Sequence, residues 1–141
     1  MTISPTTYLT AAVPRRNFAD FSVARQVWEG VGCAALAGSV TGVALGTSAW
    51  LYLATAALAT IAGIPAATQH RTLRGALVRT SVGGFVWAGA VLMVYALCGQ
   101  TAAFPVLQPQ WYLVSTTLPA MAVGWLVWTW AQHASPEISR G

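Results

Sequence analysis

A ridge of small residues runs through the first long apolar segment of this chain. Its members recur at every fourth position: Gly30, Ala34, Gly38, Gly42 and Gly46. Residues four apart lie on one face of an α-helix, so this face carries no bulky side chain. Each glycine inside a water-soluble helix costs about 0.5–1 kcal/mol. In lipid, small residues instead let two helix backbones approach closely. The ridge therefore indicates a membrane-spanning helix that packs against another helix.

The composition supports an integral membrane protein. Hydrophobic residues make up 56% of the 141 residues and charged residues only 7%, whereas about 25% of residues in a globular domain are charged. Crossing the hydrocarbon core takes about 20 apolar residues. We predict four such spans, preceded by a segment 1–26 and followed by a tail 132–141: residues 27–46, 48–68, 77–98 and 111–131. The predicted fold is an all-α bundle of four transmembrane helices.

The arginines predict the orientation of the spans. They precede the first span, surround the connection between the second and third, and follow the fourth: Arg15, Arg16, Arg25, Arg71, Arg74, Arg79 and Arg140. The other two connections carry no charge. The positive-inside rule then places both termini in the cytoplasm, and we expect a bacterial cell membrane. Because the arginines flank spans and form no stripe that could follow phosphates, the net charge of +4 predicts no nucleic-acid partner.

Two connections leave their local structure open. Phe18, Phe21, Ala24 and Trp28 are spaced to line one face of a short interfacial helix, or else belong to an extension of the first span. Between the first two spans, Gly46 is suited to a left-handed position after the helix, and Thr47 or Ser48 to the cap of the next. This pattern predicts a tight antiparallel hairpin.

Two features inside the spans need hydrogen-bond partners. Pro119 frees a backbone carbonyl in the fourth span, and we expect a hydroxyl one turn earlier, on residues 115–117, to satisfy it. Trp87 and Trp125 lie deeper than the other tryptophans, so their indole N–H groups are expected to find carbonyl or threonine oxygens on neighbouring helices.

Acidic residues are the first place to look for chemistry in a membrane, and this chain has few. Its three acids are Asp20, Glu29 and Glu137, and only Glu29 lies near a span. One interpretation pairs Glu29 with Arg25, four residues earlier, as an ordinary charge pair at a helix end. The other makes Glu29 a proton or cation site at the mouth of the bundle. Asp20 and Glu29 are the weak candidates for a catalytic acid.

Metal and cofactor sites find little support in the sequence. His70 and His133 are both expected on the cytoplasmic side, and without a carboxylate or cysteine partner they are weak candidates for a metal site. Cys33 and Cys98 lie in apolar spans and are interpreted as small buried side chains. No nucleophile–base arrangement, haem ligand pair or phosphate loop appears, so we expect no cofactor.

Small-residue faces continue beyond the first span. They are centred on Gly63 in the second, Gly84 in the third and Gly124 in the fourth. Such faces mediate close helix contact, either within one chain or between chains. Four helices need not bury every such face internally. We therefore expect, besides the lipid bilayer, a membrane-protein partner or a homo-oligomer.

Three functions are compatible with these features of the sequence. The first is a non-catalytic subunit or scaffold of a larger membrane complex. The second is a small transporter or oligomeric pore that uses Glu29. In size and four-span layout the chain resembles small multidrug exporters in outline, but these carry a glutamate well inside their first helix, whereas Glu29 lies near the edge. Holin-like pores also fit the small size and the glycine faces. The third is a membrane-embedded enzyme, similar to an isoprenoid cyclase, with Glu29 or Asp20 as the acid.

Overall fold

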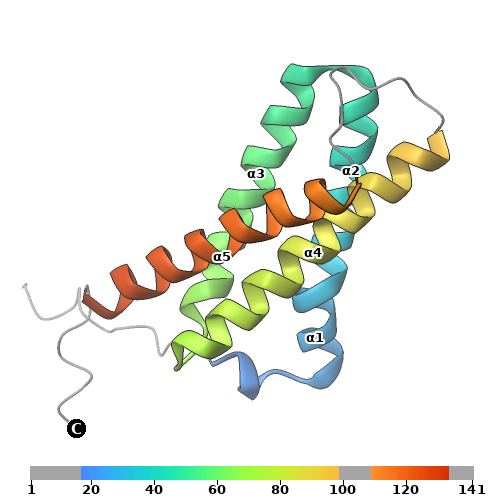
Figure 1. Cartoon of the computed structure of the whole chain (residues 1–141). Coiled ribbons are helices and arrows are strands. Elements are labelled where there is room, and N and C mark those ends of the chain that lie inside the picture. Colours follow the sequence, from blue (N-terminus) through green and yellow to red (C-terminus); the bar gives the residue numbers. More distant parts are fainter. Residues whose placement is uncertain (1–16, 99–108, 134–141) are drawn as a thin grey trace, which may run out of the picture.

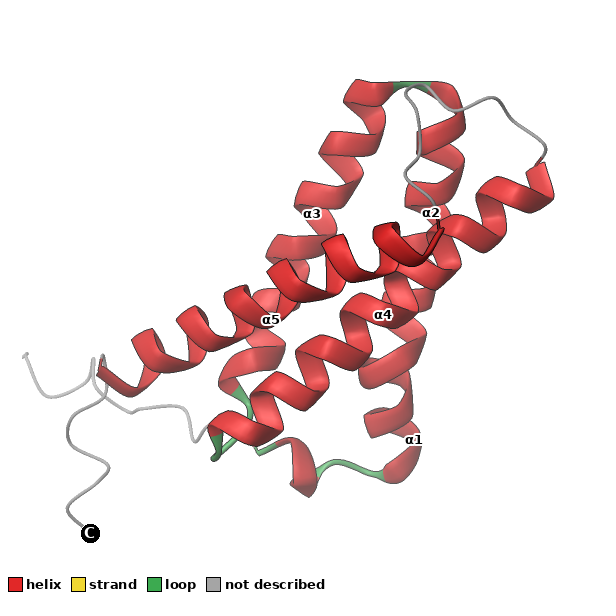
Figure 2. Ribbon diagram, viewed as in Figure 1, coloured by secondary structure: helices red, strands yellow, loops and turns green. Residues whose placement is uncertain are grey.

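The computed structural model describes residues 17–98 and 109–133, and these ranges contain helices joined by short turns (Figures 1 and 2). The elements are η2 (Phe18–Asp20), α1 (Val23–Val27), η3 (Trp28–Gly32), α2 (Cys33–Thr47), α3 (Ala49–Thr68), α4 (Leu73–Cys98) and α5 (Pro109–His133). Helices α1 and α2 join through the π-helical turn η3 into one helix, Val23–Thr47. The described ranges therefore hold four helices long and apolar enough to cross a membrane, which indicates a multi-pass membrane protein.

Several expectations lie outside the described residues. These are the arginines at positions 15, 16 and 140, the acid Glu137, most of the uncharged connection 99–110, and the tail from residue 134. Within the described ranges, three of the four long helices extend past at least one end of the predicted span, whereas α3 begins one residue later than predicted and ends where predicted. Helix α4, for example, begins at Leu73 and carries Arg74 and Arg79 in its first two turns. Backbone hydrogen bonding thus continues beyond the apolar core, where side-chain hydropathy gives no signal.

The approach to the first long helix differs from the interfacial helix that was one of two expectations. The α-helix begins at Val23, and the Ser22 hydroxyl accepts a hydrogen bond from the Arg25 backbone N–H at 3.4 Å. Phe18 and Phe21 precede this cap, in and after the short turn η2. The four positions that were expected on one helix face, Phe18, Phe21, Ala24 and Trp28, therefore do not lie in one helix. A helical extension of the span accounts for Ala24 and Trp28 alone.

The joint between α2 and α3 is a single extended residue, Ser48, with φ −159° and ψ 136°. Its backbone N–H donates to the Ala44 carbonyl at 3.0 Å, and its own carbonyl accepts from Tyr52 at 2.9 Å. Gly46 lies inside α2, so the predicted left-handed position after the helix is wrong. The extended conformation of Ser48 reverses the chain direction, so the turn requires no residue in the left-handed conformation.

Helix α4 lies at the centre of the arrangement, in contact with α2 on one side and α5 on the other. Figure 1 shows α4 and α5 running diagonally across the hairpin of α2 and α3. Gly38 and Gly42 are buried against α4. A Cβ atom at Gly42 would lie 2.7 Å from the Val91 carbonyl oxygen, and one at Gly38 would overlap the Trp87 carbonyl oxygen. The backbones of α2 and α4 therefore come too close to admit any side chain at these two positions.

The other small positions divide into two groups. Between α4 and α5, a Cβ at Gly84 would lie 2.9 Å from Ala120 Cβ, and one at Gly124 would overlap the Thr80 side chain. By contrast, a Cβ at Gly30 or at Gly63 would meet no atom within 4 Å in the part of the chain that the structure describes. Ala34 and Gly46 are partly exposed. In the ridge of the first long helix, close contact with α4 is thus made at the middle positions, Gly38 and Gly42. On α3, the backbone at Gly63 is uncovered by the other described residues.

At the end of the molecule opposite the arginines, an apolar core surrounds a pair of tyrosines. Leu45, Ala88 and Val91 are buried there with Tyr112, whose hydroxyl lies 3.0 Å from that of Tyr52. Trp87 stacks on Tyr112 with ring centroids 6.5 Å apart. The indole N–H of Trp87 is buried without a hydrogen-bond partner among the described residues, so the expected partner is not found. Trp125 is 49% exposed.

Hydroxyl groups before Pro119 form hydrogen bonds, but their acceptor is not the carbonyl that the proline leaves without a backbone donor. Ser115 and Thr116 donate to the Tyr112 carbonyl at 3.1 and 2.8 Å. Proline at 119 frees the carbonyl of residue 115, and the recorded hydroxyl bonds go one turn earlier. A second helix-internal proline, Pro65 in α3, was not singled out from the sequence.

Candidate functional site

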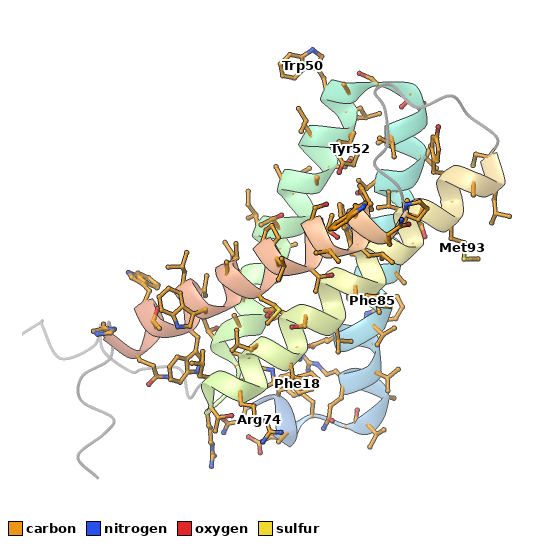
Figure 3. All side chains as sticks on the ribbon, viewed as in Figure 1. Phe18, Trp50, Tyr52, Arg74, Phe85 and Met93 are labelled. Atoms are coloured by element: carbon orange, nitrogen blue, oxygen red, sulfur yellow. The ribbon has the colours of Figure 1, made fainter. Side chains whose placement is uncertain are left out.

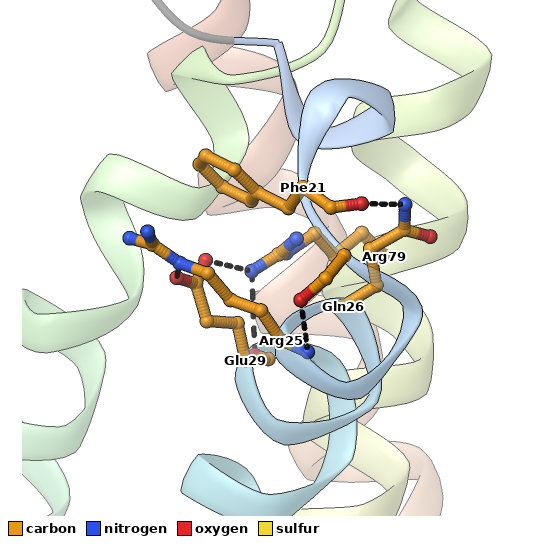
Figure 4. A network of polar contacts seen from close by, with 6 residues as sticks. Phe21, Arg25, Gln26, Glu29 and Arg79 are labelled. Atoms are coloured by element: carbon orange, nitrogen blue, oxygen red, sulfur yellow. Dashed lines mark hydrogen bonds and ion pairs between the residues drawn. The ribbon is translucent and has the colours of Figure 1, made fainter.

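The candidate site lies where η2, the first long helix and α4 meet, and is centred on Glu29. Arg25 Nε donates to Glu29 Oε1 at 2.7 Å, and Arg79 Nη2 lies 3.6 Å from Glu29 Oε2 (Figure 4). The same Nη2 donates to the Glu29 backbone carbonyl at 3.3 Å. The pairing with Arg25 follows from the sequence spacing of four. The pairing with Arg79, fifty residues away, ties the first helix to α4.

Arg79 is the most enclosed charge of this site. Its side chain is 9% exposed, against 21% for Glu29 and 54% for Arg25. The Phe18 ring lies under its guanidinium at 3.8 Å from the ring centroid, a cation–π contact. Phe18 is in turn fixed by its backbone N–H, which donates to the Gln69 carbonyl at 3.1 Å. Residues 17–22, just before the first long helix, therefore fold back under the helices, and Phe18 covers Arg79.

The π-helical turn η3 places Glu29 within reach of α4. It covers Trp28–Gly32, and the Cys33 N–H at its end bonds to the Trp28 carbonyl. A Cβ at Gly32 would overlap the Trp28 ring, so a side chain at position 32 would require this ring to move. Single π-helical turns inside α-helices are frequent at functional sites. Here the turn contains the carbonyl that receives Arg79.

His70 connects three elements at the same place. Its ring lies 5.3 Å from the Phe18 ring, and its carbonyl accepts a hydrogen bond from the Trp128 indole N–H of α5 at 3.2 Å. Burial lowers the pKa of His70 below its usual value, and the positive charge of Arg79 lowers it further. His70 is therefore neutral near pH 7.

Buried polar atoms without partners gather around Phe18. Within residues 17–98 and 109–133 they include Gln69 Oε1, His70 Nε2 and Arg79 Nη1. Each of these residues contacts Phe18 through the interactions given above. An open groove of about 660 Å³ passes this cluster and is lined by Phe18, His70 and Arg79 among others. Unpaired buried polar groups beside a groove are a common mark of a ligand site.

The remaining candidates from the sequence do not join this cluster. Asp20 accepts hydrogen bonds from Asn17, at 3.2 Å from the backbone and 3.3 Å from the side chain. His133 Nδ1 donates to the Thr129 carbonyl of its own helix at 2.7 Å. Cys33 and Cys98 are exposed free thiols, so the expectation that they are buried is wrong. Among the residues placed by the structure, no three His, Cys, Asp or Glu side chains could hold a metal ion together.

The pKa of His70 predicts a loss of stability in mild acid. Between its lowered pKa and the unfolded value of about 6.5, the unfolded chain binds more protons than the native protein. The free energy of unfolding therefore falls as the pH drops below about 6.5 and does not change through His70 above it. We expect His70→Asn to remove this dependence and His133→Asn to keep it.

The check is the unfolding midpoint of each detergent-solubilised variant between about pH 7.5 and pH 5.5, above the range in which carboxylates titrate. An unchanged pH dependence in His70→Asn would contradict the assignment.

Comparisons of the chain with protein-family models, with curated proteins and with solved structures find no match. Its function is therefore inferred from its own residues.

Proposed function

We propose that this chain is a non-catalytic subunit or scaffold of a larger complex in the cell membrane, with both ends in the cytoplasm. The observation that carries the proposal is the environment of Glu29. Both carboxylate oxygens lie next to guanidinium groups, Arg25 at 2.7 Å and Arg79 at 3.6 Å. Binding a cation or delivering a proton from Glu29 would require breaking two ion pairs, one of which, with Arg79, joins the first long helix to α4.

This environment weighs against the other two functions. A transporter of the exporter type needs an acid that is free to exchange its ligand, and Glu29 lies only in the second turn of the helix Val23–Thr47. An enzyme acting on a lipophilic substrate needs an acid that faces the apolar interior. Asp20 lies before the first helix and is bonded to Asn17. We therefore assign Glu29 a structural role, in which its ion pair with Arg79 holds the first long helix against α4. Such a role suits a non-catalytic subunit.

Helix α3 is the proposed docking face for the partner. Ala67 is its one buried residue among Ala49–Thr68, and the backbone at Gly63 has open space in front of it. A partner helix can approach closely at such a position because no side chain intervenes. The single fully buried alanine also means that this helix contributes little to the chain's own core.

Gly63→Leu is expected to leave the chain folded and to remove most of the partner that accompanies it. A Cβ at Gly63 would meet no atom within 4 Å among the described residues, but the leucine side chain would hold a docked helix away. Gly83→Leu on α4 is the matched control, since its position is equally open within the chain. The measurement is the amount of partner that copurifies with each tagged variant from native membranes. Equal recovery from wild type and Gly63→Leu would exclude α3 as the docking face.

A further inference from the structure

Two open grooves flank one exposed face of α4 at the arginine end of the molecule. Both are lined by Arg74, Val78 and Val82, which are spaced four residues apart and so share this face. The groove of about 580 Å³ extends to Met121 of α5. The groove of about 660 Å³ extends to Val31 at the start of the first long helix. We call the shared residues, Arg74, Val78 and Val82, the Arg74 ridge.

One end of the ridge is polar and positively charged. Arg74 is exposed there, and Figure 3 shows it at the same end as Phe18. Thr72, His70 and Arg79 line the same end of the larger groove. Arg79 is 9% exposed, and its Nη1 has no hydrogen-bond partner among the described residues. Glu29 is shared between Arg25 and Arg79, so this end keeps a surplus of positive charge.

The other end of the ridge is apolar and open to the surroundings. Val78 and Val82 are 57% and 43% exposed, and Val31 across the larger groove is 41% exposed. From Arg74 to Val82 the helix rises by about 12 Å. Gly30 also lines the larger groove, and a Cβ there would meet no atom within 4 Å among residues 17–98 and 109–133. A glycine at this position keeps the groove from being filled by a side chain.

We propose that the Arg74 ridge binds one anionic diacyl phospholipid of the membrane, with its phosphate at Arg74 and one acyl chain in each groove. Arginine is suited to phosphate because its guanidinium donates two parallel hydrogen bonds. Basic pockets beside transmembrane helices are a recognised way to bind anionic headgroups. A small free anion would use only the polar end and would leave both apolar grooves unexplained. This inference does not depend on the proposed subunit role.

The headgroup is tested by titrating the full-length chain in detergent with phosphatidylglycerol and measuring retained lipid by native mass spectrometry. Arg74→Gln is expected to weaken binding roughly fivefold, the effect of one arginine near an anionic lipid. Arg71→Gln is the matched control, because Arg71 is exposed nearby but lines neither groove. Equal weakening by both variants, or equal binding of zwitterionic phosphatidylcholine, would overturn the proposal. So would displacement of the lipid by equimolar inorganic phosphate, which would indicate a small-anion site.

The two chains are tested separately from the headgroup. Lysophosphatidylglycerol carries the same headgroup on one chain and should bind at least roughly tenfold more weakly, since one chain loses its groove. Gly30→Leu should fill the larger groove, lower the affinity for phosphatidylglycerol and leave that for the single-chain lipid unchanged. Its unfolding midpoint reports whether the fold is kept. If one-chain and two-chain lipids bind equally, or folded Gly30→Leu binds phosphatidylglycerol like wild type, the two-groove arrangement is wrong.

Discussion

Gly38→Leu is expected to prevent stable packing of α2 on α4. A Cβ at Gly38 would overlap the Trp87 carbonyl oxygen and lie 2.9 Å from Ala90 Cβ. A backbone carbonyl in the middle of α4 cannot rotate away, so the two helices must separate. Overpacking costs about 1–3 kcal/mol where side chains can adjust, and we expect the upper end of this range or more here.

The matched control is Gly83→Leu, where a Cβ would meet no atom within 4 Å in the part of the chain that the structure describes. Leucine has the higher helix propensity by nearly 1 kcal/mol, so the control should be as stable as wild type or slightly more stable. The measurement is the fraction of monodisperse protein in detergent, together with its unfolding midpoint. Similar behaviour of the two variants would mean that α2 and α4 do not approach each other at Gly38.

Arg79→Met is expected to destabilise the protein far more than Arg25→Met. Removing one partner of a buried ion pair typically costs about 3–5 kcal/mol. Glu29 is 21% exposed and keeps Arg25, so we expect about 2–3 kcal/mol for Arg79→Met. Arg25 is 54% exposed, and an exposed pair four residues apart contributes only about 0.5 kcal/mol or less.

A double variant separates the ion pair from the packing of the side chain. In Glu29→Gln/Arg79→Met both charges of this pair are removed together, and the charge that loses its partner is Arg25, which is 54% exposed, so part of the stability lost in Arg79→Met should return. The measurement is the unfolding free energy of the four combinations in detergent. Equal losses in Arg79→Met and Arg25→Met, or no recovery in the double variant, would contradict the role of Arg79 as the tie between the two helices.

The four apolar helices could be predicted because hydropathy reports length and burial in lipid directly. The starts of the first long helix and of α4 could not be predicted, since the turns that carry Arg25, Arg74 and Arg79 are polar. At the hairpin joint, the left-handed position predicted for Gly46 was wrong, because one extended residue, Ser48, makes the turn; Ser48 does stand at the N-cap of α3, as one of the two predicted candidates.

Of the candidate site, only the contact between residues close in sequence could be predicted. Glu29 and Arg25 are four residues apart in one helix, and this spacing alone pairs them. Arg79 and Phe18 are distant in sequence, and their contact depends on how α4 packs and how the preceding segment folds back. The open position of Gly63 and the closed one of Gly38 are also indistinguishable in sequence, because both belong to the same kind of small-residue face.

The most direct test of the proposed role is mass spectrometry of what accompanies a tagged wild-type chain gently purified from its native membranes. We predict foreign membrane subunits in fixed stoichiometry with this chain. A clean monomer, or an oligomer of this chain alone, would contradict the subunit role and would redirect the search to transport and enzyme assays of Glu29→Gln.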